Sequence, residues 1–315
     1  MTASDPIVTM IVPGRDIADF APAALDSLRA QSEPRWRAVL VDDGSRDATA
    51  AVFAEAAESD PRFRVVTHAE SRGLGAARNS ALDLVDTPLV GFLDADDELT
   101  PAALARLTGT LAVSGSDLVA AAYVRSRFDG EAYVSGRVQP WVAAATDPER
   151  LGTTITAHPA ASANIVAWSK VSRTDMWHDL RFPEGVAYED QVVAQLLYTR
   201  ARAFDVIPDA VVRWRVRADG SSITQGKARL PVLRDYLAAL RGGIRVLHEA
   251  GAGGAVTARL NLILAMDLPP LRDIAAQHPD PDYAATLDAF VADLQSLPEY
   301  ADARPDPTLA AGLGW

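Results

Sequence analysis

Three carboxylates, Asp94, Asp96 and Asp97, stand directly after an apolar segment at residues 89–93. Unpaired carboxylates beside an apolar core are costly, so they normally coordinate a cation or bind polar ligand groups. Alternate side chains of an extended segment lie on the same side, which places Asp94 and Asp96 together. Such oxygen ligands suit a divalent cation, whose usual partner is an anionic substrate such as a diphosphate. The spacing therefore predicts half of a metal site.

Two further polar clusters follow other apolar segments. Pro13 and Gly14 end the first of these segments, and Asp42 and Asp43 end the second. Each cluster alone is typical of an ordinary turn, because Asp and Gly favour tight turns. In an open parallel sheet, however, ligands bind at the carboxyl ends of the strands. Three such clusters at one edge of a sheet favour a binding site.

The elements that must position these clusters alternate between strands and helices. Apolar segments and segments with helical spacing follow one another through the first 125 residues, which predicts an α/β fold with a mostly parallel sheet flanked by helices. Glycine and proline break residues 126–156, which predicts a loop or hairpin insertion. We expect strands at 7–12, 36–41, 62–67, 89–93, 117–125 and 203–216, and helices at 17–30, 47–59, 73–85, from 100, at 188–201 and across 227–297, with breaks at Pro269-Pro270 and two other points.

Composition excludes several classes of protein. A net charge of −12 disfavours nucleic acid and anionic membrane surfaces as general partners, because both need a basic footprint. The absence of cysteine excludes disulfides, thiolate metal sites and cysteine nucleophiles. The N-terminus lacks the pattern of a signal peptide, and no stretch approaches the roughly 20 apolar residues of a membrane span. We therefore expect a cytoplasmic protein and leave open a peripheral association with the inner face of the membrane.

The order of the motifs along the chain resembles that of family 2 glycosyltransferases, which have the GT-A fold. The resemblance spans about residues 6–225 and leaves the C-terminal helices outside it. It is similar in particular to members that build or decorate bacterial wall polymers or surface polysaccharides. The motifs that carry it are residues 8–13, 40–47, 72–79 and 92–97, followed by 168–170, 181–185, 189–190, Arg215 and 221–224.

This resemblance implies a metal-dependent, inverting transfer of a sugar, hexosyl or N-acetylhexosaminyl, from a UDP-linked donor to an acceptor hydroxyl. The acceptor would be a glycan or a polyol phosphate, and the cofactor would be Mn²⁺ or Mg²⁺. The implied catalytic domain covers residues 1–225, with a nucleotide-sugar half at 1–125 and an acceptor half at 126–225. A helical subdomain follows at 226–315, and self-association through it stays open.

The resemblance also assigns roles to single residues by matching position. Asp96 resembles the main metal ligand, and Asp94 resembles the residue that faces the ribose and the metal. Asp190 resembles the catalytic base, with Glu189 beside it. The other positions implied at the nucleotide sugar are Pro13, Gly14, Asp42 at the nucleobase, its neighbour Asp43, Arg72, Arg78, Ala95, Arg215 at the pyrophosphate, and Ser222.

Two other functions remain open. A nucleotidyltransferase also uses acidic strand ends and a metal, although the polar segment after the first strand is short for one. A non-catalytic glycan-binding or scaffold protein could keep the same fold, but the presence of Asp94, Asp96 and Asp190 argues against it. UDP binding that requires Mn²⁺ would separate the enzyme from the scaffold. The side chains of Trp141, Trp168, Trp177 and Trp214 could stack on sugars, with core packing favoured for each.

Overall fold

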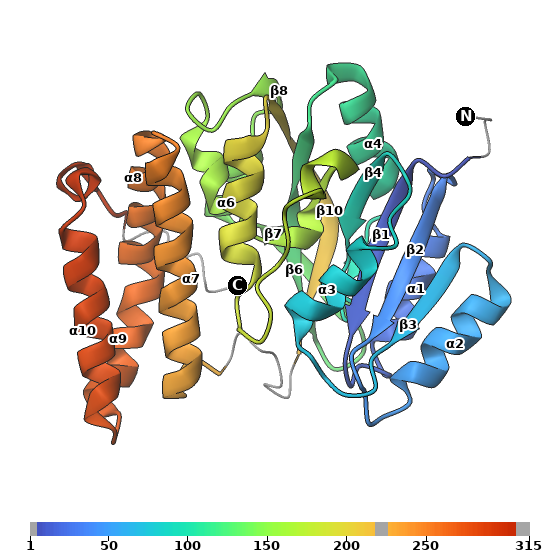
Figure 1. Ribbon diagram of the computed structural model, residues 1–315, viewed down its shortest axis with the longest axis horizontal. Helices are drawn as coiled ribbons and strands as arrows, with labels where there is room; N and C mark the ends of the chain where they lie inside the picture. Colours follow the sequence, from blue (N-terminus) through green and yellow to red (C-terminus); the bar gives the residue numbers. More distant parts are fainter. Residues whose placement is uncertain (1–4, 218–225, 307–315) are drawn as a thin grey trace.

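The computed structural model describes residues 5–217 and 226–306, and its described part contains one ten-stranded sheet (Figure 1). The strands are β1 (Val8–Gly14), β2 (Trp36–Asp42), β3 (Phe63–Thr67), β4 (Leu89–Phe92), β5 (Glu98–Leu99), β6 (Leu118–Phe128), β7 (Tyr133–Val138), β8 (Arg150–Thr153), β9 (Lys170–Arg173) and β10 (Phe204–Val216). Their order is β3-β2-β1-β4-β9-β6-β10-β5, with β7 paired to β6 and β8 paired to β10.

Most of the central pairings are parallel. The neighbours β3, β2, β1 and β4 pair in parallel, as do β6 and β10. Strand β9 lies between β4 and β6 and is antiparallel to both. The predicted α/β fold with a mostly parallel sheet is confirmed, and the clusters after β1, β2 and β4 end at one edge of it.

Helices flank this sheet and continue beyond it. They are α1 (Ala21–Arg29), α2 (Thr49–Ser59), α3 (Leu74–Leu82), α4 (Ala103–Ser114), α5 (Pro140–Thr146), α6 (Asp190–Arg200), α7 (Leu230–Glu249), α8 (Gly253–Leu262), α9 (Leu268–Gln277) and α10 (Pro281–Gln295), with a π-helix η5 (Ile263–Asp267) and short 3₁₀ turns η1 (Pro159–Ala163), η2 (Ala167–Ser169), η3 (Thr174–Trp177) and η6 (Pro298–Asp302). Among the described residues, no helix is both long and apolar enough to cross a membrane.

Local chemistry explains several of these boundaries. The carboxylate of Asp47 accepts hydrogen bonds from the amide and hydroxyl of Thr49 at 2.9 and 2.6 Å, which satisfies the first backbone amide of α2. Likewise, the side chain of Asp280 accepts a hydrogen bond from the amide of Asp282 at the start of α10. The burial of β1 along most of its length matches its position between two parallel neighbours.

One expectation from the sequence is confirmed and another was wrong in detail. The hairpin expected within residues 126–156 is present, because β7 pairs antiparallel with β6, and α5 and β8 follow it. The predicted break at Pro269-Pro270 is not a gap between helices. The prolines lie in the first turn of α9, directly after η5, where a residue without an amide hydrogen costs little.

The C-terminal helices α7 to α10 lie side by side at one end of the sheet (Figure 1). Helix α7 packs against α6, and α8 packs against η1. A Cβ atom at Gly242 would lie 2.7 Å from a methyl of Val192, so glycine is needed for this close approach of α7 to α6. The C-terminal helices are therefore attached to the helix that begins with Asp190.

Candidate active site

A cavity of about 960 Å³ extends from the carboxyl ends of β1, β2 and β4 to the C-terminal helices. It brings together most of the site residues expected from the sequence, namely Pro13, Gly14, Asp43, Arg78, Asp94, Ala95, Asp96, Glu189 and Asp190. Three expected residues, Asp42, Arg72 and Arg215, do not line it. One further expected residue, Ser222, lies outside the described residues.

The acidic cluster after β4 fits a divalent cation. One carboxylate oxygen from each of Asp94, Asp96 and Asp97 lies within 4.8 Å of the others. Burial and the neighbouring carboxylates raise the pKa of Asp97 well above its usual value, and burial also raises the pKa of Asp94. Three oxygens that repel one another at this distance form a donor set that suits Mg²⁺ or Mn²⁺.

Two arginines at the end of β10 contact this cluster in different ways. The guanidinium of Arg215 is buried and donates to the backbone oxygens of Asp96 and Phe20, at 2.6 and 2.9 Å. Arg217, which the sequence analysis did not select, lines the cavity and donates to the carboxylate of Asp96 at 2.7 and 3.0 Å. The geometry therefore gives Arg215 a positioning contact and leaves Arg217 as the arginine that faces the cavity. Its sequence signal was weak, being only a second arginine two residues further along.

Arg78 connects the acidic cluster to the start of α6. Its side chain is 1% exposed and donates to Asp94 at 2.7 Å and to Glu189. Burial alone would lower the pKa of Arg78, but these carboxylates raise it above its usual value. Helix α3 can pack closely against the backbone at Pro183 because Gly75 has no side chain. A Cβ atom at Gly75 would lie 2.1 Å from the backbone oxygen of Pro183.

Asp190 is the first residue of α6, and its carboxylate faces the cavity. This carboxylate forms no hydrogen bond or ion pair with another side chain within residues 5–217 or 226–306. Burial, followed by the charge of Glu189, raises the pKa of Asp190 to about 7. A carboxylate in this state is suited to accept a proton near neutral pH.

A buried lysine lies behind Asp190. The ammonium of Lys170 donates to the side-chain oxygen of Asn164 at 2.9 Å and to the backbone oxygen of Val166 at 2.6 Å. Burial lowers the pKa of Lys170 to about 7, while the charge of Asp190 opposes that change. Both side chains line a second, small cavity of about 10 Å³, close to the space that one water molecule needs.

Of the two aspartates at the end of β2, Asp43 is the one that lines the cavity. Its carboxylate accepts hydrogen bonds from the amides of Arg72 and Gly73, both at 2.9 Å, and from the hydroxyl of Ser71 at 2.7 Å. Burial alone would raise the pKa of Asp43, but these hydrogen bonds lower it. This carboxylate fixes the loop that precedes α3.

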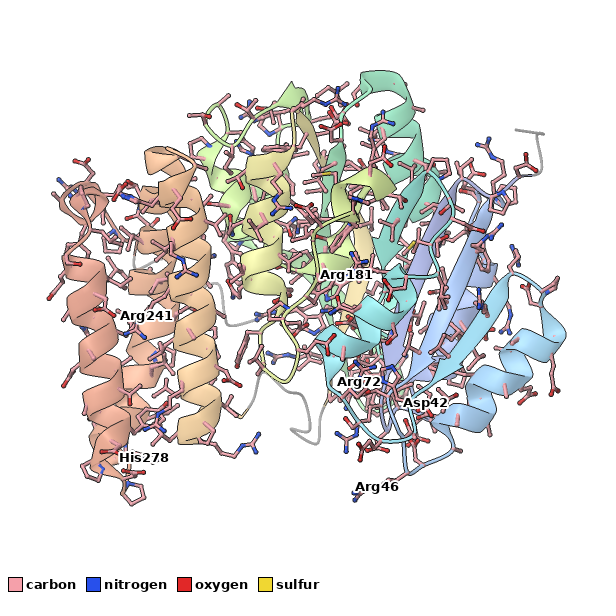
Figure 2. The ribbon with its side chains drawn as sticks, in the orientation of Figure 1. Asp42, Arg46, Arg72, Arg181, Arg241 and His278 are labelled. Atoms are coloured by element: carbon pink, nitrogen blue, oxygen red, sulfur yellow. The ribbon has the colours of Figure 1, made fainter. Side chains whose placement is uncertain are left out.

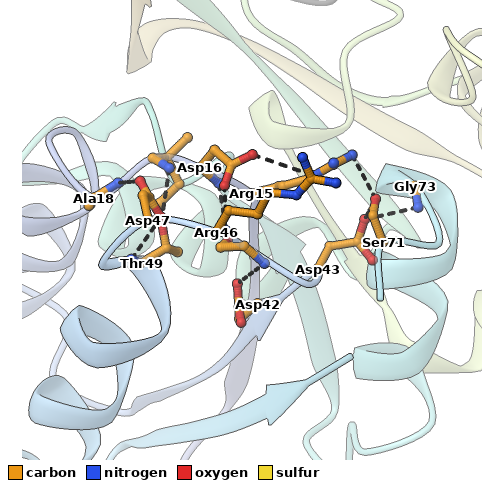
Figure 3. A network of polar contacts seen from close by, with 12 residues as sticks. Arg15, Asp16, Ala18, Asp42, Asp43, Arg46, Asp47, Thr49, Ser71 and Gly73 are labelled. Carbon is orange, nitrogen blue, oxygen red and sulfur yellow. Dashed lines mark hydrogen bonds and ion pairs between the residues drawn. The ribbon is translucent and has the colours of Figure 1, made fainter. Parts of the chain in front are cut away.

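The neighbouring positions have structural contacts instead. Asp42 is buried and accepts a hydrogen bond from the amide of Ser45 at 3.1 Å, which closes the turn after β2 (Figure 3). The side chain of Arg72 is half exposed and lies 3.3 Å from the carboxylate of Glu184. Figure 2 shows Asp42 and Arg72 at the same end of the sheet, away from the C-terminal helices.

The half of the cavity that lies toward the C-terminal helices, called the far half below, contains residues that the sequence motifs did not indicate. Trp141, Trp168 and Trp214 line it, whereas Trp177 stacks on Phe182 in the core with ring centroids 5.3 Å apart. The C-terminal helices add a second group, which has no counterpart in the motifs because it lies outside the region of resemblance. The residues gained in this half are Tyr123, Arg125, Tyr188, Lys227, Tyr236, Arg259 and Asp267.

The sequence profile described as "Glycosyl transferase family 2" matches residues 9–171, a stretch that includes β1, the acidic cluster and β6. The chain belongs to glycosyl transferase family 2. The family that the motifs predict is therefore confirmed. Among curated proteins, the chain is 39% identical over 121 residues to the succinoglycan biosynthesis protein ExoU of Rhizobium meliloti, a match that covers 38% of this chain and 34% of ExoU. The chain matches only 34% to 39% of the length of three bacterial relatives, one of which is ExoU.

Solved structures confirm the GT-A fold of this family 2 chain. The structure of S. aureus TarS 1-349 in complex with UDP has a TM-score of 0.74 and 20% identity, and the match covers 98% of this chain and 87% of TarS. A mannosyltransferase from Pyrobaculum calidifontis, in complex with GDP-Man and Mn²⁺, has a TM-score of 0.59 and 20% identity, covering 99% of this chain and 86% of that one. At this identity the likeness concerns the fold alone.

Proposed function

We propose that this chain is a metal-dependent, inverting glycosyltransferase that moves a sugar from a UDP-linked donor to a hydroxyl of a polysaccharide, wall polymer or other glycan. One observation carries the proposal: a single cavity contains both the acidic cluster around Asp96 and the carboxylate of Asp190. A transfer with inversion needs a cation at the leaving diphosphate and a base on the opposite side of the anomeric carbon. Family membership supports the same class of reaction.

Asp94, Asp96 and Asp97 are the residues that would hold Mn²⁺ or Mg²⁺. When bound, the cation supplies Lewis-acid neutralisation of the departing diphosphate. Arg217 lies next to this cluster and offers a planar guanidinium with several donors for phosphate oxygens. We therefore assign the pyrophosphate contact to Arg217, and assign Arg215 to the position of the loop.

Asp190 would accept the proton of the acceptor hydroxyl on its carboxylate. Its raised pKa suits this role, and general-base assistance of this kind contributes typically about 10²–10⁴-fold in rate. Glu189 is paired with Arg78, so it would orient the start of α6 rather than transfer a proton. Asp43, with its loop, would form the wall of the nucleobase pocket in place of Asp42.

Two solved structures with the same fold bear on the identity of the donor. The fold neighbour TarS has been crystallised with UDP-GlcNAc, whereas the mannosyltransferase contains GDP-Man, so the fold accepts more than one nucleotide. We retain UDP as the proposed nucleotide, with a hexosyl or N-acetylhexosaminyl group as the sugar. The proposed catalytic domain of residues 1–225 ends among residues that lie outside the described ranges.

Calorimetry with UDP, GDP and Mn²⁺ tests the proposal. Tight binding of UDP that requires Mn²⁺ supports it, and release of UDP from a UDP-sugar in the presence of acceptor supports transfer. Release of inorganic pyrophosphate from a nucleoside triphosphate and a sugar phosphate would instead identify a nucleotidyltransferase. A protein that binds no nucleotide with or without metal would contradict both enzyme functions.

A further inference from the structure

The far half of the cavity contains three cationic side chains. Arg125, Lys227 and Arg259 line this half, and none of them forms an ion pair with a carboxylate within residues 5–217 and 226–306. This is unexpected in a chain whose net charge is −12. Buried or half-buried cations without a counter-ion are costly, so they point to a ligand that supplies the negative charge.

Arg125 gives the clearest case. It pairs with Trp214 in the register of β6 and β10, so the two side chains lie next to each other on the same face. Its guanidinium carbon lies 4.8 Å from the ring centre of Trp214 and 5.6 Å from that of Trp141. The Nε atom of Arg125 is buried and has no hydrogen-bond partner. Arg125 lines the cavity, and an arginine keeps its charge at physiological pH, so its guanidinium presents a fixed positive charge to a ligand there.

Lys227 and Arg259 extend this surface into the C-terminal helices. The ammonium of Lys227 lies 3.8 Å from the ring centre of Tyr236 and 5.7 Å from that of Tyr188. Within the described parts of the chain, the guanidinium of Arg259 donates to a neutral group, the side-chain amide oxygen of Gln191, at 3.3 Å. The rings of Tyr188 and Tyr236 hold the ammonium of Lys227 in place and contribute no negative charge.

No carboxylate of the described residues forms an ion pair with these cations, although the charge of Asp267 acts on Lys227. Glu189 pairs with Arg78, and Asp267 accepts a hydrogen bond from the hydroxyl of Tyr236 at 2.5 Å. Asp190 is the proposed base and lies between the two halves of the cavity. The cations are also distinct from the donor side, which β1, β2, α3 and β4 supply. The ligand that these cations bind is therefore the acceptor.

We propose that Arg125, Lys227 and Arg259, with the rings of Trp141 and Trp214, form an acceptor subsite for an anionic glycan. The recognised group is a carboxylate or a phosphate, which a guanidinium binds through two parallel hydrogen bonds. The tryptophan rings provide apolar faces for the sugar itself. This inference rests on the proposed function, because it requires the ligand of this half to be the acceptor.

Binding of paired probes to the full chain, with UDP and diamagnetic Mg²⁺ present, tests the subsite. Methyl glucuronide and methyl glucoside differ by a carboxylate, and glycerol 1-phosphate and glycerol differ by a phosphate. We expect at least one anionic probe to bind about tenfold to a hundredfold more tightly than its neutral partner in NMR titrations. The two pairs separate an acidic sugar from a phosphate-bearing acceptor. Equal affinity within both pairs would overturn the proposal.

Variants locate the effect. Arg125→Gln and Lys227→Gln should each reduce the preference for the anionic probe about tenfold while UDP affinity stays within about twofold. Arg137→Gln, an exposed arginine on the neighbouring strand β7, is the matched control and should keep the preference. If Arg125→Gln fails to fold, Lys227→Gln decides alone. If both variants keep the preference for the anionic probe, the subsite is contradicted. If the unchanged chain binds no UDP, the proposed function is contradicted instead.

Discussion

The guanidinium of Arg78 bonds to the carboxylate of Glu189 although 111 residues separate them along the chain. The same guanidinium also bonds to Asp94 at 2.7 Å. One buried side chain thus connects the loop with the acidic cluster to the start of α6, where Asp190 lies. The distance between the proposed metal site and the proposed base therefore depends on Arg78.

Replacement of Arg78 by Gln should destabilise the fold strongly. The change leaves Glu189 and Asp94 without their partner, and breaking a buried ion pair costs about 3–5 kcal/mol. Urea unfolding measures the free energy of unfolding. Arg37→Gln removes an exposed pair with Asp86 and should cost below about 1 kcal/mol. Similar losses in both variants would show that Arg78 does not stabilise this connection.

Replacement of Asp96 by Ala should abolish transfer and weaken the Mn²⁺-dependent binding of UDP. Asp96 provides one of the three carboxylates of the cluster, and two remaining ligands hold a divalent cation less well. Calorimetry with UDP at fixed Mn²⁺ measures the change. Asp86→Ala removes an exposed carboxylate and serves as the control. Unchanged UDP binding in Asp96→Ala would exclude this aspartate as a metal ligand.

Replacement of Asp190 by Asn should separate chemistry from binding. The amide keeps the shape of the side chain but cannot accept the proton, so kcat should fall about 10²–10⁴-fold. UDP affinity should stay near that of the unchanged chain, because Asp190 does not belong to the acidic cluster. Steady-state kinetics and calorimetry give the two values. An equal loss of both would identify Asp190 as a donor ligand.

The rate should depend on pH through Asp190. Only the ionised carboxylate accepts a proton, and its pKa is raised to about 7, so kcat/KM should rise with pH up to about 7 and then level off. The folded chain also holds this proton more tightly than the unfolded chain. The free energy of unfolding of the metal-free protein should therefore fall as pH rises from about 4 to about 7. A kcat/KM that is flat above about pH 5 would contradict the raised pKa.

Replacement of Lys170 by Met should move this pH profile. The positive charge of Lys170 opposes the rise in the pKa of Asp190, so its removal should shift the acid limb of kcat/KM to higher pH. If Lys170 has only a structural role, its replacement should change the free energy of unfolding and leave the acid limb of kcat/KM at the same pH. The pH profile of the variant therefore distinguishes the two roles.

The sequence by itself determined the alternation of strands and helices through the first 125 residues, the family and the acidic cluster. These depend on local pattern: apolar segments alternate with helical spacing, and Asp94, Asp96 and Asp97 are close together in the chain as well as in space. The position of Asp190 at a helix start was also visible in the spacing. Each strand, helix start and motif is set by residues close together in the sequence, so local pattern is enough to indicate it.

Only the tertiary structure decided which member of each polar pair faces the cavity. Asp43 reaches it and Asp42 does not, and Arg217 reaches it while Arg215 is buried. Strand register and contacts over long sequence separations set these outcomes, as in the hydrogen bond from the amide of Arg215 to Asp97, 118 residues apart. The cationic half of the cavity depends on how α7, α8 and η5 pack against the sheet domain. No local pattern records that packing.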